Sequence, residues 1–275
     1  MTTRPANKAF NFYVITLALA VLVRLAVPVI GDASLMVTML TPAVAAVIMV
    51  TVIAPEGGFR ASVARLGLAH AGLKGWPLAI GGPALIHLAG LLLLAALGLT
   101  ALVAPQMAGS GAGVAVKILV GFLIGTALAL GEAVGWRGYM LPCMQGVGIV
   151  TTLLLVGLLH GLWHLPLLWT TDYYHATGNR WIVAPQFLIT LTLAGVFYGF
   201  LRIWTGSVWP VAVAYAVANM AWEIATEVSQ TKSGMVLEYV SGESGLIMIC
   251  GLLVIDVVLI RALRSWAAAG ISAPA

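Results

Sequence analysis

Charged residues are scarce in this chain. They make up 8% of its 275 residues, whereas 61% are hydrophobic. A water-soluble domain carries about 25% charged residues, so this scarcity excludes an ordinary soluble globule. The few lysines and arginines are scattered between apolar stretches, where they set membrane topology, so the net charge of +4 predicts no nucleic-acid partner.

Cysteine is nearly absent as well. Only Cys143 and Cys250 occur, both in or beside apolar segments, so no disulfide framework is implied. Neither cysteine lies near residues that would activate a thiol. We therefore expect both to be buried as small hydrophobic side chains.

Long hydrophobic runs are abundant. Several reach about 20 residues, the length that an α-helix needs to cross a bilayer. We predict an all-α, polytopic integral membrane protein, with residues 1–275 forming a single transmembrane domain of about eight transmembrane helices around an intramembrane polar cavity. The predicted spans are residues 10–31, 34–54, 75–104, 115–136, 147–170, 184–203, 207–229 and 244–263. The third is long enough to be tilted or broken, with Gly81, Gly82 and Pro83 as the weak point.

The loop charges predict an orientation. With the N-terminus in the cytoplasm, most basic residues fall on inner loops, while the outer loops collect Asp32, Asp172, Glu238 and Glu243. Cytoplasmic loops are enriched in Lys and Arg, so we expect both termini to be cytoplasmic, in a bacterial cytoplasmic membrane. The segment 56–75 is amphipathic and basic, and we expect it to lie along the inner surface.

Polar side chains interrupt several spans, although a charged one costs about 2.5–3.5 kcal/mol at the membrane centre. Glu132 lies in the fourth span. His160 and His164 are four residues apart, so they share one face of the fifth span. The seventh span has a polar stripe at every fourth position: Tyr215, Asn219, Glu223 and Glu227. Polar groups on three helices at overlapping depth predict a functional cavity, whereas the lone His87 is expected to be packed and hydrogen-bonded.

These residue types fit hydrolysis by an activated water. A glutamate held away from bulk water can act as a general base, a histidine can position water and carry its proton, and an asparagine amide can donate to an oxyanion. Glu132, His164 and Asn219 would thus form a hydrolase site inside the bilayer. Zinc held by His160, His164 and Glu132 is the alternative. The spacing HGLWH lacks the glutamate of HExxH, so we expect no metal or other cofactor.

Three segments resemble the motifs of the CAAX prenyl protease and bacteriocin-processing (CPBP) family of intramembrane proteases. They read GEAVGWRGYMLP, HGLWHLP and SVWPVAVAYAVAN, and they lie within a motif-bearing core at about residues 115–229. The eight-span layout is similar to that family over most of the chain. The resemblance implies an endopeptidase in which Glu132 activates water at a site formed with His164 and Asn219.

The first motif departs from the family pattern of two adjacent glutamates followed by an arginine. Glu132 and Arg137 match, but Ala133 replaces the second glutamate. The natural partner of the arginine is therefore missing. Arg137 can pair instead with Glu132, at a poorer helical spacing, or with Glu223 from another helix.

The other two motifs also differ at one position each. His164 and Asn219 match the family, while His160 stands in an aromatic position and Tyr215 stands where a histidine belongs. Tyr215 keeps an O–H donor that can bind an oxyanion. His160, one turn from His164, can take over the role of the missing histidine.

Three functions are consistent with these residues. The first is an intramembrane hydrolase that cleaves a peptide bond near a membrane-embedded or lipidated end. The second is a repurposed enzyme that performs acid–base chemistry on an apolar small molecule. The third is an inactive pseudoprotease that serves as an immunity factor or scaffold. The expected partners are membrane lipids together with such a peptide or small molecule.

Overall fold

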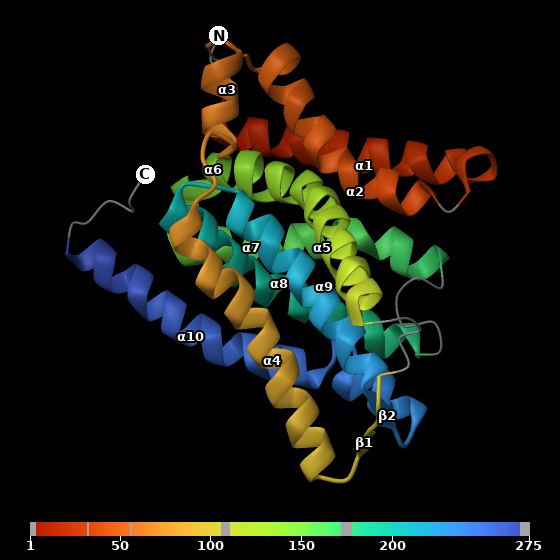
Figure 1. Ribbon diagram of the computed structural model, residues 1–275. Coiled ribbons are helices and arrows are strands. Elements are labelled where there is room, and N and C mark those ends of the chain that lie inside the picture. The colour runs from red at the N-terminus through yellow and green to blue at the C-terminus, as the bar shows by residue number, and fades with distance from the viewer. Residues whose placement is uncertain (1–3, 32, 56, 106–110, 172–177, 270–275) are drawn as a thin grey trace.

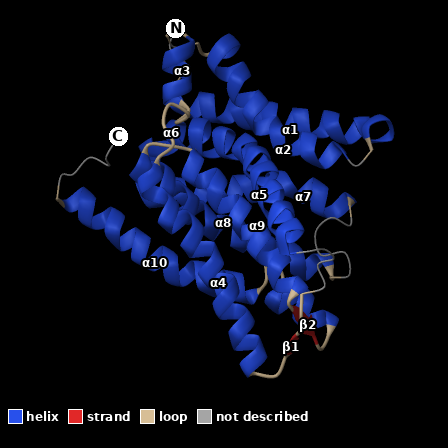
Figure 2. Cartoon of the chain, viewed as in Figure 1, coloured by secondary structure: helices blue, strands red, loops and turns tan. Residues whose placement is uncertain are grey.

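The computed structural model describes residues 4–31, 33–55, 57–105, 111–171 and 178–269. Asp32 and Asp172, assigned above to outer loops, lie outside these residues. The described chain is almost entirely helical (Figures 1 and 2). Its α-helices are α1 (Pro5–Ile30), α2 (Ala33–Ile48), α3 (Phe59–Arg65), α4 (Trp76–Ala96), α5 (Gly111–Ala133), α6 (Leu141–Met144), α7 (Ile149–Thr170), α8 (Arg180–Thr205), α9 (Trp209–Glu227) and α10 (Leu246–Ala268).

Shorter elements connect these helices. Three are π-helical and two are 3₁₀-helical: η1 (Met49–Ile53), η2 (Leu73–Gly75), η3 (Val134–Met140), η4 (Gln145–Val147) and η5 (Val236–Ser241). Two strands, β1 (Thr100–Leu102) and β2 (Ser229–Thr231), form a small antiparallel sheet. In Figure 1 this sheet lies at the opposite end of the molecule from α3 and the N-terminus.

Seven segments of the described chain are long and apolar enough to cross a membrane. They correspond to α1, α2 with η1, η2 with α4, α5 through η4, α7, α8, and η5 with α10. The prediction of an all-α, polytopic integral membrane protein is confirmed. The helix α9 has 19 residues, but its polar stripe leaves it outside this set, so the count of about eight spans stays a prediction.

The ends of two predicted spans are wrong. α4 runs without a break through Gly81, Gly82 and Pro83, and it ends at Ala96. A Cβ on Gly82 would lie 2.8 Å from Phe197 Cζ, so this glycine permits close approach of α8 rather than a break in α4. The chain then turns at Gly98, which has a φ of +68°, and enters β1.

The fourth predicted span is longer than expected. It continues from α5 through η3, α6 and η4, so that the apolar segment covers residues 111–147. The π-helix η3 lies against α2 and the turn after α3, and a Cβ on Gly138 would lie 2.6 Å from the Leu66 carbonyl oxygen. The glycines of the GWRG segment therefore allow this close packing.

The centre of the molecule is built around α7 and α8. These helices touch at two glycines, since a Cβ on Gly157 would lie 2.9 Å from the Cα of Gly195. Small residues let transmembrane helices approach closely enough for backbone-to-backbone contact. Helix α8 also packs against α10, while α9 packs against α4 and α5.

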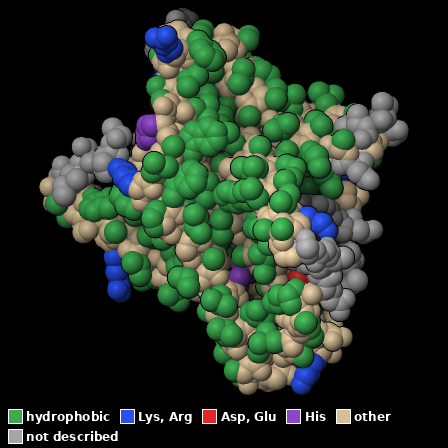
Figure 3. Space-filling model, viewed as in Figure 1, with side chains coloured by type: hydrophobic (Ala, Val, Ile, Leu, Met, Phe, Trp, Pro, Cys, Tyr) green, Lys and Arg blue, Asp and Glu red, His purple; other side chains and the backbone are tan. Residues whose placement is uncertain are grey.

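The outer surface is hydrophobic. Figure 3 shows hydrophobic side chains over most of the visible face, with few charged groups, as expected for a surface that faces lipid. Cys143 is partly buried, and Cys250 on α10 is exposed, so the prediction of burial is wrong for Cys250. An apolar side chain on a lipid-facing surface has no water to avoid.

The segment 56–75 contains α3 and η2, joined by turns at Gly67 and Gly72 with positive φ. The Gly67 carbonyl accepts a hydrogen bond from the Val208 N–H at 3.0 Å, which ties the segment to the start of α9. Phe59 is 81% exposed at the beginning of α3. The placement of this segment along the inner membrane surface stays a prediction.

Candidate active site

The structure brings the predicted site residues together from three parts of the bundle: α5 with η3, α7, and α9. Glu132 lies in the last turn of α5 and Arg137 in η3, immediately after it. In a π turn the backbone hydrogen bond joins residues five apart rather than four. Glu132 and Arg137 are five apart, so the wider turn lets both side chains face inward. Both are buried, with relative exposures of 2% and 0%. The widened helix thus overcomes the poor spacing expected of a regular α-helix.

Two histidines of α7 surround the Glu132 carboxylate. His160 Nε2 lies 2.9 Å from Glu132 Oε2, which is a hydrogen bond. His164 Nε2 lies 3.8 Å from the same oxygen, which is too long for a direct hydrogen bond. Their four-residue spacing on one helix face explains why both reach the same carboxylate.

Arg137 makes contacts that the sequence did not predict. Its Nη1 donates to the Tyr215 hydroxyl at 2.7 Å and to His160 Nδ1 at 3.2 Å. Within the described chain it forms no ion pair with Glu132 or Glu223, so both predicted pairings are wrong. Arg137 instead contacts Tyr215 of α9 and His160 of α7.

Two stacked tyrosine rings also stabilise the Arg137 charge. The guanidinium carbon lies 5.3 Å from the ring centroid of Tyr198 and 5.6 Å from that of Tyr215. The two rings stack with centroids 4.0 Å apart. A cation within about 6 Å of an aromatic face is attracted by the ring quadrupole. The site therefore holds a buried guanidinium without a paired carboxylate.

The Arg137 contact determines which nitrogen of His160 carries hydrogen. A guanidinium can only donate, so His160 Nδ1 must accept. In the neutral imidazole the hydrogen is then on Nε2, which donates it to Glu132. A metal-ligating histidine shows the reverse pattern, with the nitrogen away from the metal donating to an acceptor.

This pattern bears on the zinc alternative. Ligand atoms of Glu132, His160 and His164 all lie within 4.8 Å of one another, so the three residues are near enough to share an ion after a small contraction. Binding through His160 Nε2 would require Nδ1 to keep its hydrogen. Arg137 directs an N–H at Nδ1 in this structure, so zinc binding through Nε2 would require that contact to change.

Aromatic rings enclose the two histidines. Trp136 lies 5.0 Å from the His160 ring, and Trp163 contacts the His164 ring edge-on at 4.5 Å between centroids. Phe187 of α8 also meets His164 edge-on, at 5.4 Å. These rings fix the imidazoles and keep water from them on that side. The tryptophans of GWRG and HGLWH were part of the quoted motifs, but no role was assigned to them from the sequence.

A cavity of about 100 Å³ opens beside the carboxylate. Glu132, His164, Tyr215 and Asn219 line it together with apolar side chains of α4, α8 and α10. This volume holds several water molecules, since one water needs about 10–15 Å³. Asn219 is exposed, and its amide makes no hydrogen bond to the described residues. Four of the six predicted site residues, from three helices, therefore share one cavity, whereas His160 and Arg137 are not among its lining residues.

The sequence placed Glu243 in an outer loop, but the structure places it in this cavity. It lies in the turn between η5 and α10, where it is partly buried and lines the cavity together with His164 and Glu132. The Thr190 hydroxyl donates to the carbonyl of the next residue, Ser244, at 3.3 Å, which holds the turn against α8. Nothing in the SGESG segment distinguishes it from an ordinary loop, so the sequence contained no signal for this position.

The segment that carries these residues is similar to a known family. Residues 113–221 match the family model of type II CAAX prenyl endopeptidases, Rce1-like. The resemblance to the CPBP family is therefore confirmed over this segment, as a similarity. The matched segment contains all six predicted site residues, while Glu243 lies beyond it. No curated protein matches the chain.

Proposed function

We propose that the chain is a glutamate-dependent intramembrane endopeptidase that hydrolyses a peptide bond near a membrane-embedded or lipidated end of its substrate. One observation carries the proposal. The Glu132 carboxylate is buried, accepts a hydrogen bond from His160, and borders a cavity that is also lined by His164 and Asn219. A buried carboxylate is costly in an apolar helix bundle, so its presence points to a function.

The 3.8 Å gap between Glu132 and His164 suggests where the nucleophile binds. A water between polar groups at such a separation can contact both of them. Glu132 takes one proton from this water while the water oxygen attacks the carbonyl carbon of the peptide bond. Glu132 then returns the proton to the nitrogen as the C–N bond breaks. His164 orients the water throughout.

Two donors are available for the oxyanion. The Asn219 amide is exposed in the cavity without a partner among the described residues. The Tyr215 hydroxyl lies 3.1 Å from His160 Nδ1, but that nitrogen has one lone pair and Arg137 already donates to it. The hydroxyl hydrogen of Tyr215 is therefore free to turn into the cavity. In this arrangement Arg137 and His160 position Tyr215 and Glu132.

The test is turnover of a Glu132→Gln variant in detergent, against a panel of prenylated and membrane-anchored peptides. Glutamine keeps the shape and can still accept from His160, but it cannot take a proton from water. We expect a folded protein without measurable turnover. Glu227→Gln, at the exposed end of α9, is the matched control and should retain activity. Turnover at the wild-type rate in Glu132→Gln would refute the proposal.

A second candidate function is acid–base chemistry on an apolar small molecule. Glu243 favours it, because a second carboxylate in the cavity lies outside the segment that matches the protease family. Two carboxylates in different surroundings can divide the roles of acid and base. The test compares metabolites of cells that produce the wild type with those that produce Glu132→Gln. Identical profiles would exclude this candidate.

A further inference from the structure

A second cavity lies next to the catalytic one. Its volume is about 280 Å³, and it is lined by residues of α4, α9, α10, η5, β1 and β2. The two cavities use neighbouring positions of the same helices. On α4, Ile86 lines the catalytic cavity and His87 the second one; on α9, Asn219 lines the first and Trp222 the second. We call this second space the outer cavity, because it lies at the β1–β2 end of the molecule.

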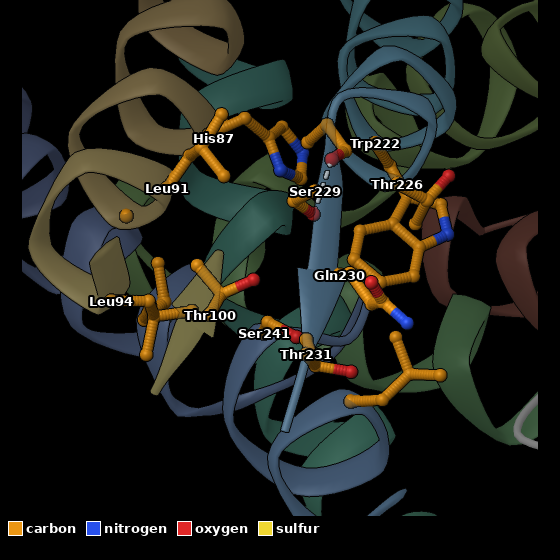
Figure 4. A pocket seen from close by; sticks show the side chains of 14 residues that line it. His87, Leu91, Leu94, Thr100, Trp222, Thr226, Ser229, Gln230, Thr231 and Ser241 are labelled. Carbon is orange, nitrogen blue, oxygen red and sulfur yellow. Dashed lines mark hydrogen bonds between the residues drawn. The ribbon is translucent and has the colours of Figure 1, made fainter. Parts of the chain in front are cut away.

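The outer cavity is lined by both apolar and uncharged polar side chains, and among the described residues no Asp, Glu, Lys or Arg lines it. Figure 4 shows hydroxyl, amide and imidazole groups from opposite walls around it, together with the ring of Trp222. His87 and Thr100 are 7% and 4% exposed. His87 Nε2 and Thr100 Oγ1 have no hydrogen-bond partner in the described chain, contrary to the partner expected for His87. Buried polar atoms are nearly always paired, so both point to a ligand.

We propose that the outer cavity binds the unwound stretch of substrate beside the cleaved bond and selects an uncharged residue there. This inference rests on the proposed endopeptidase function. A peptide bond within a helix must be unwound before water can attack it, which frees backbone N–H and C=O groups. Inside a membrane these groups need protein partners, because no bulk water is present. The imidazole of His87, the hydroxyl of Thr100 and the amide of Gln230 supply such partners.

The small sheet supports the same interpretation. Within the described chain, β1 and β2 pair only with each other, so each strand keeps an unpaired edge. An extended peptide can add to such an edge through backbone hydrogen bonds. Thr100 in β1 and Gln230 in β2 also line the outer cavity, so the sheet and the orphaned side chains border the same space.

The spacing along α9 gives the position of the selected residue. Trp222 and Thr226 lie three and seven residues beyond Asn219, or about 4.5–10 Å along the helix axis. An extended peptide advances about 3.3 Å per residue. The outer cavity should therefore receive a residue about one to three positions from the cleaved bond. A charged side chain there would lose its hydration without gaining a partner.

The experiment uses a membrane-anchored peptide that the wild type cleaves, with Thr, Tyr, Asp or Lys placed in turn at each position near the cleaved bond. We expect Asp and Lys to lower kcat/KM by about tenfold or more at one to three positions on one side, with Thr and Tyr tolerated. Gln230→Glu adds a negative charge at nearly constant shape. It should restore cleavage of the Lys peptide and leave the Asp peptide poor. Gln145→Glu, exposed in η4 at the other end of the molecule, is the matched control.

The outcomes separate the two proposals. If the wild type cleaves and Glu132→Gln does not, but charged residues are tolerated at every position, the outer cavity does not select substrate and this inference is overturned alone. An unchanged Lys-to-Asp preference in Gln230→Glu has the same consequence. If the wild type cleaves no peptide, or Glu132→Gln cleaves as well as the wild type, the proposed function fails and this inference fails with it.

Discussion

Removing the hydroxyl of Tyr215 tests how the chain tolerates a buried guanidinium without a carboxylate. Tyr215→Phe keeps the ring that stacks on Tyr198 and faces Arg137, so the cation–π contacts at 5.3 and 5.6 Å remain. The change deletes only the oxygen that accepts from Arg137 Nη1 at 2.7 Å. His160 Nδ1 would then be the remaining acceptor for that nitrogen.

The magnitude follows from the kind of hydrogen bond that is lost. A hydrogen bond to a charged group contributes about 1.5–3 kcal/mol, and here no water can replace the lost acceptor. For a chain of this size that loss corresponds to a fall in Tm of about 3–12 °C. If the Tyr215 hydroxyl also serves the oxyanion, kcat falls by about 10²–10³-fold.

The assay is thermal unfolding in detergent together with turnover of a membrane-anchored peptide. Tyr198→Phe is the matched control, because it removes a hydroxyl that makes no hydrogen bond to the described residues from the ring stacked on Tyr215. Tyr215→His, which introduces the residue of the family motif, keeps an acceptor for Arg137 and should retain most of the stability. Equal Tm and equal turnover for Tyr215→Phe and the wild type would refute the role assigned to this hydroxyl.

Other predictions concern catalysis, metal content and packing. Asn219→Ala should lower kcat by about 10²–10³-fold with little change in Tm, since the amide makes no structural hydrogen bond; unchanged kcat would remove it from the oxyanion site. Glu243→Gln should lower kcat less than Glu132→Gln does, and a larger effect would make Glu243 the base. The purified protein should contain no stoichiometric zinc and should keep its turnover with a chelator, whereas one bound zinc per chain would contradict the tautomer argument. Gly157→Ala should destabilise the fold by about 1–3 kcal/mol, because its Cβ would lie 2.9 Å from the Cα of Gly195; an unchanged unfolding curve would show that α7 and α8 can separate.

Much of the lining of the cavity beside Glu132 was predictable, because residues of one motif on one helix have a fixed geometric relation. His160 and His164 share one helix face wherever α7 lies in the bundle, and the same holds for Tyr215 and Asn219 on α9. A stretch of apolar residues also has few alternatives to a helix in a membrane, since every backbone group must be paired within the segment. Hydropathy and residue spacing were therefore sufficient for the fold class and for the shared helix faces of these residues.

The partners of Arg137 were not predictable in this way. Helical spacing favoured a carboxylate on the same or a neighbouring helix, but η3 widens the turn after Glu132 and brings Arg137 to Tyr215 and His160. Whether a helix takes the π form depends on what packs against it. Here Gly138 of η3 packs closely against the Leu66 carbonyl, and Leu66 lies in a distant part of the chain.

The sequence by itself determined that the chain folds as apolar helices in a membrane and that His160 and His164 share one helix face, because hydropathy and helical periodicity act over short stretches. Only the tertiary structure decided that Glu243 enters the catalytic cavity and that α4 stops at Ala96 so that Thr100 can pair with Thr231. Those outcomes depend on contacts between segments that are distant in the chain, and no local pattern encodes such contacts.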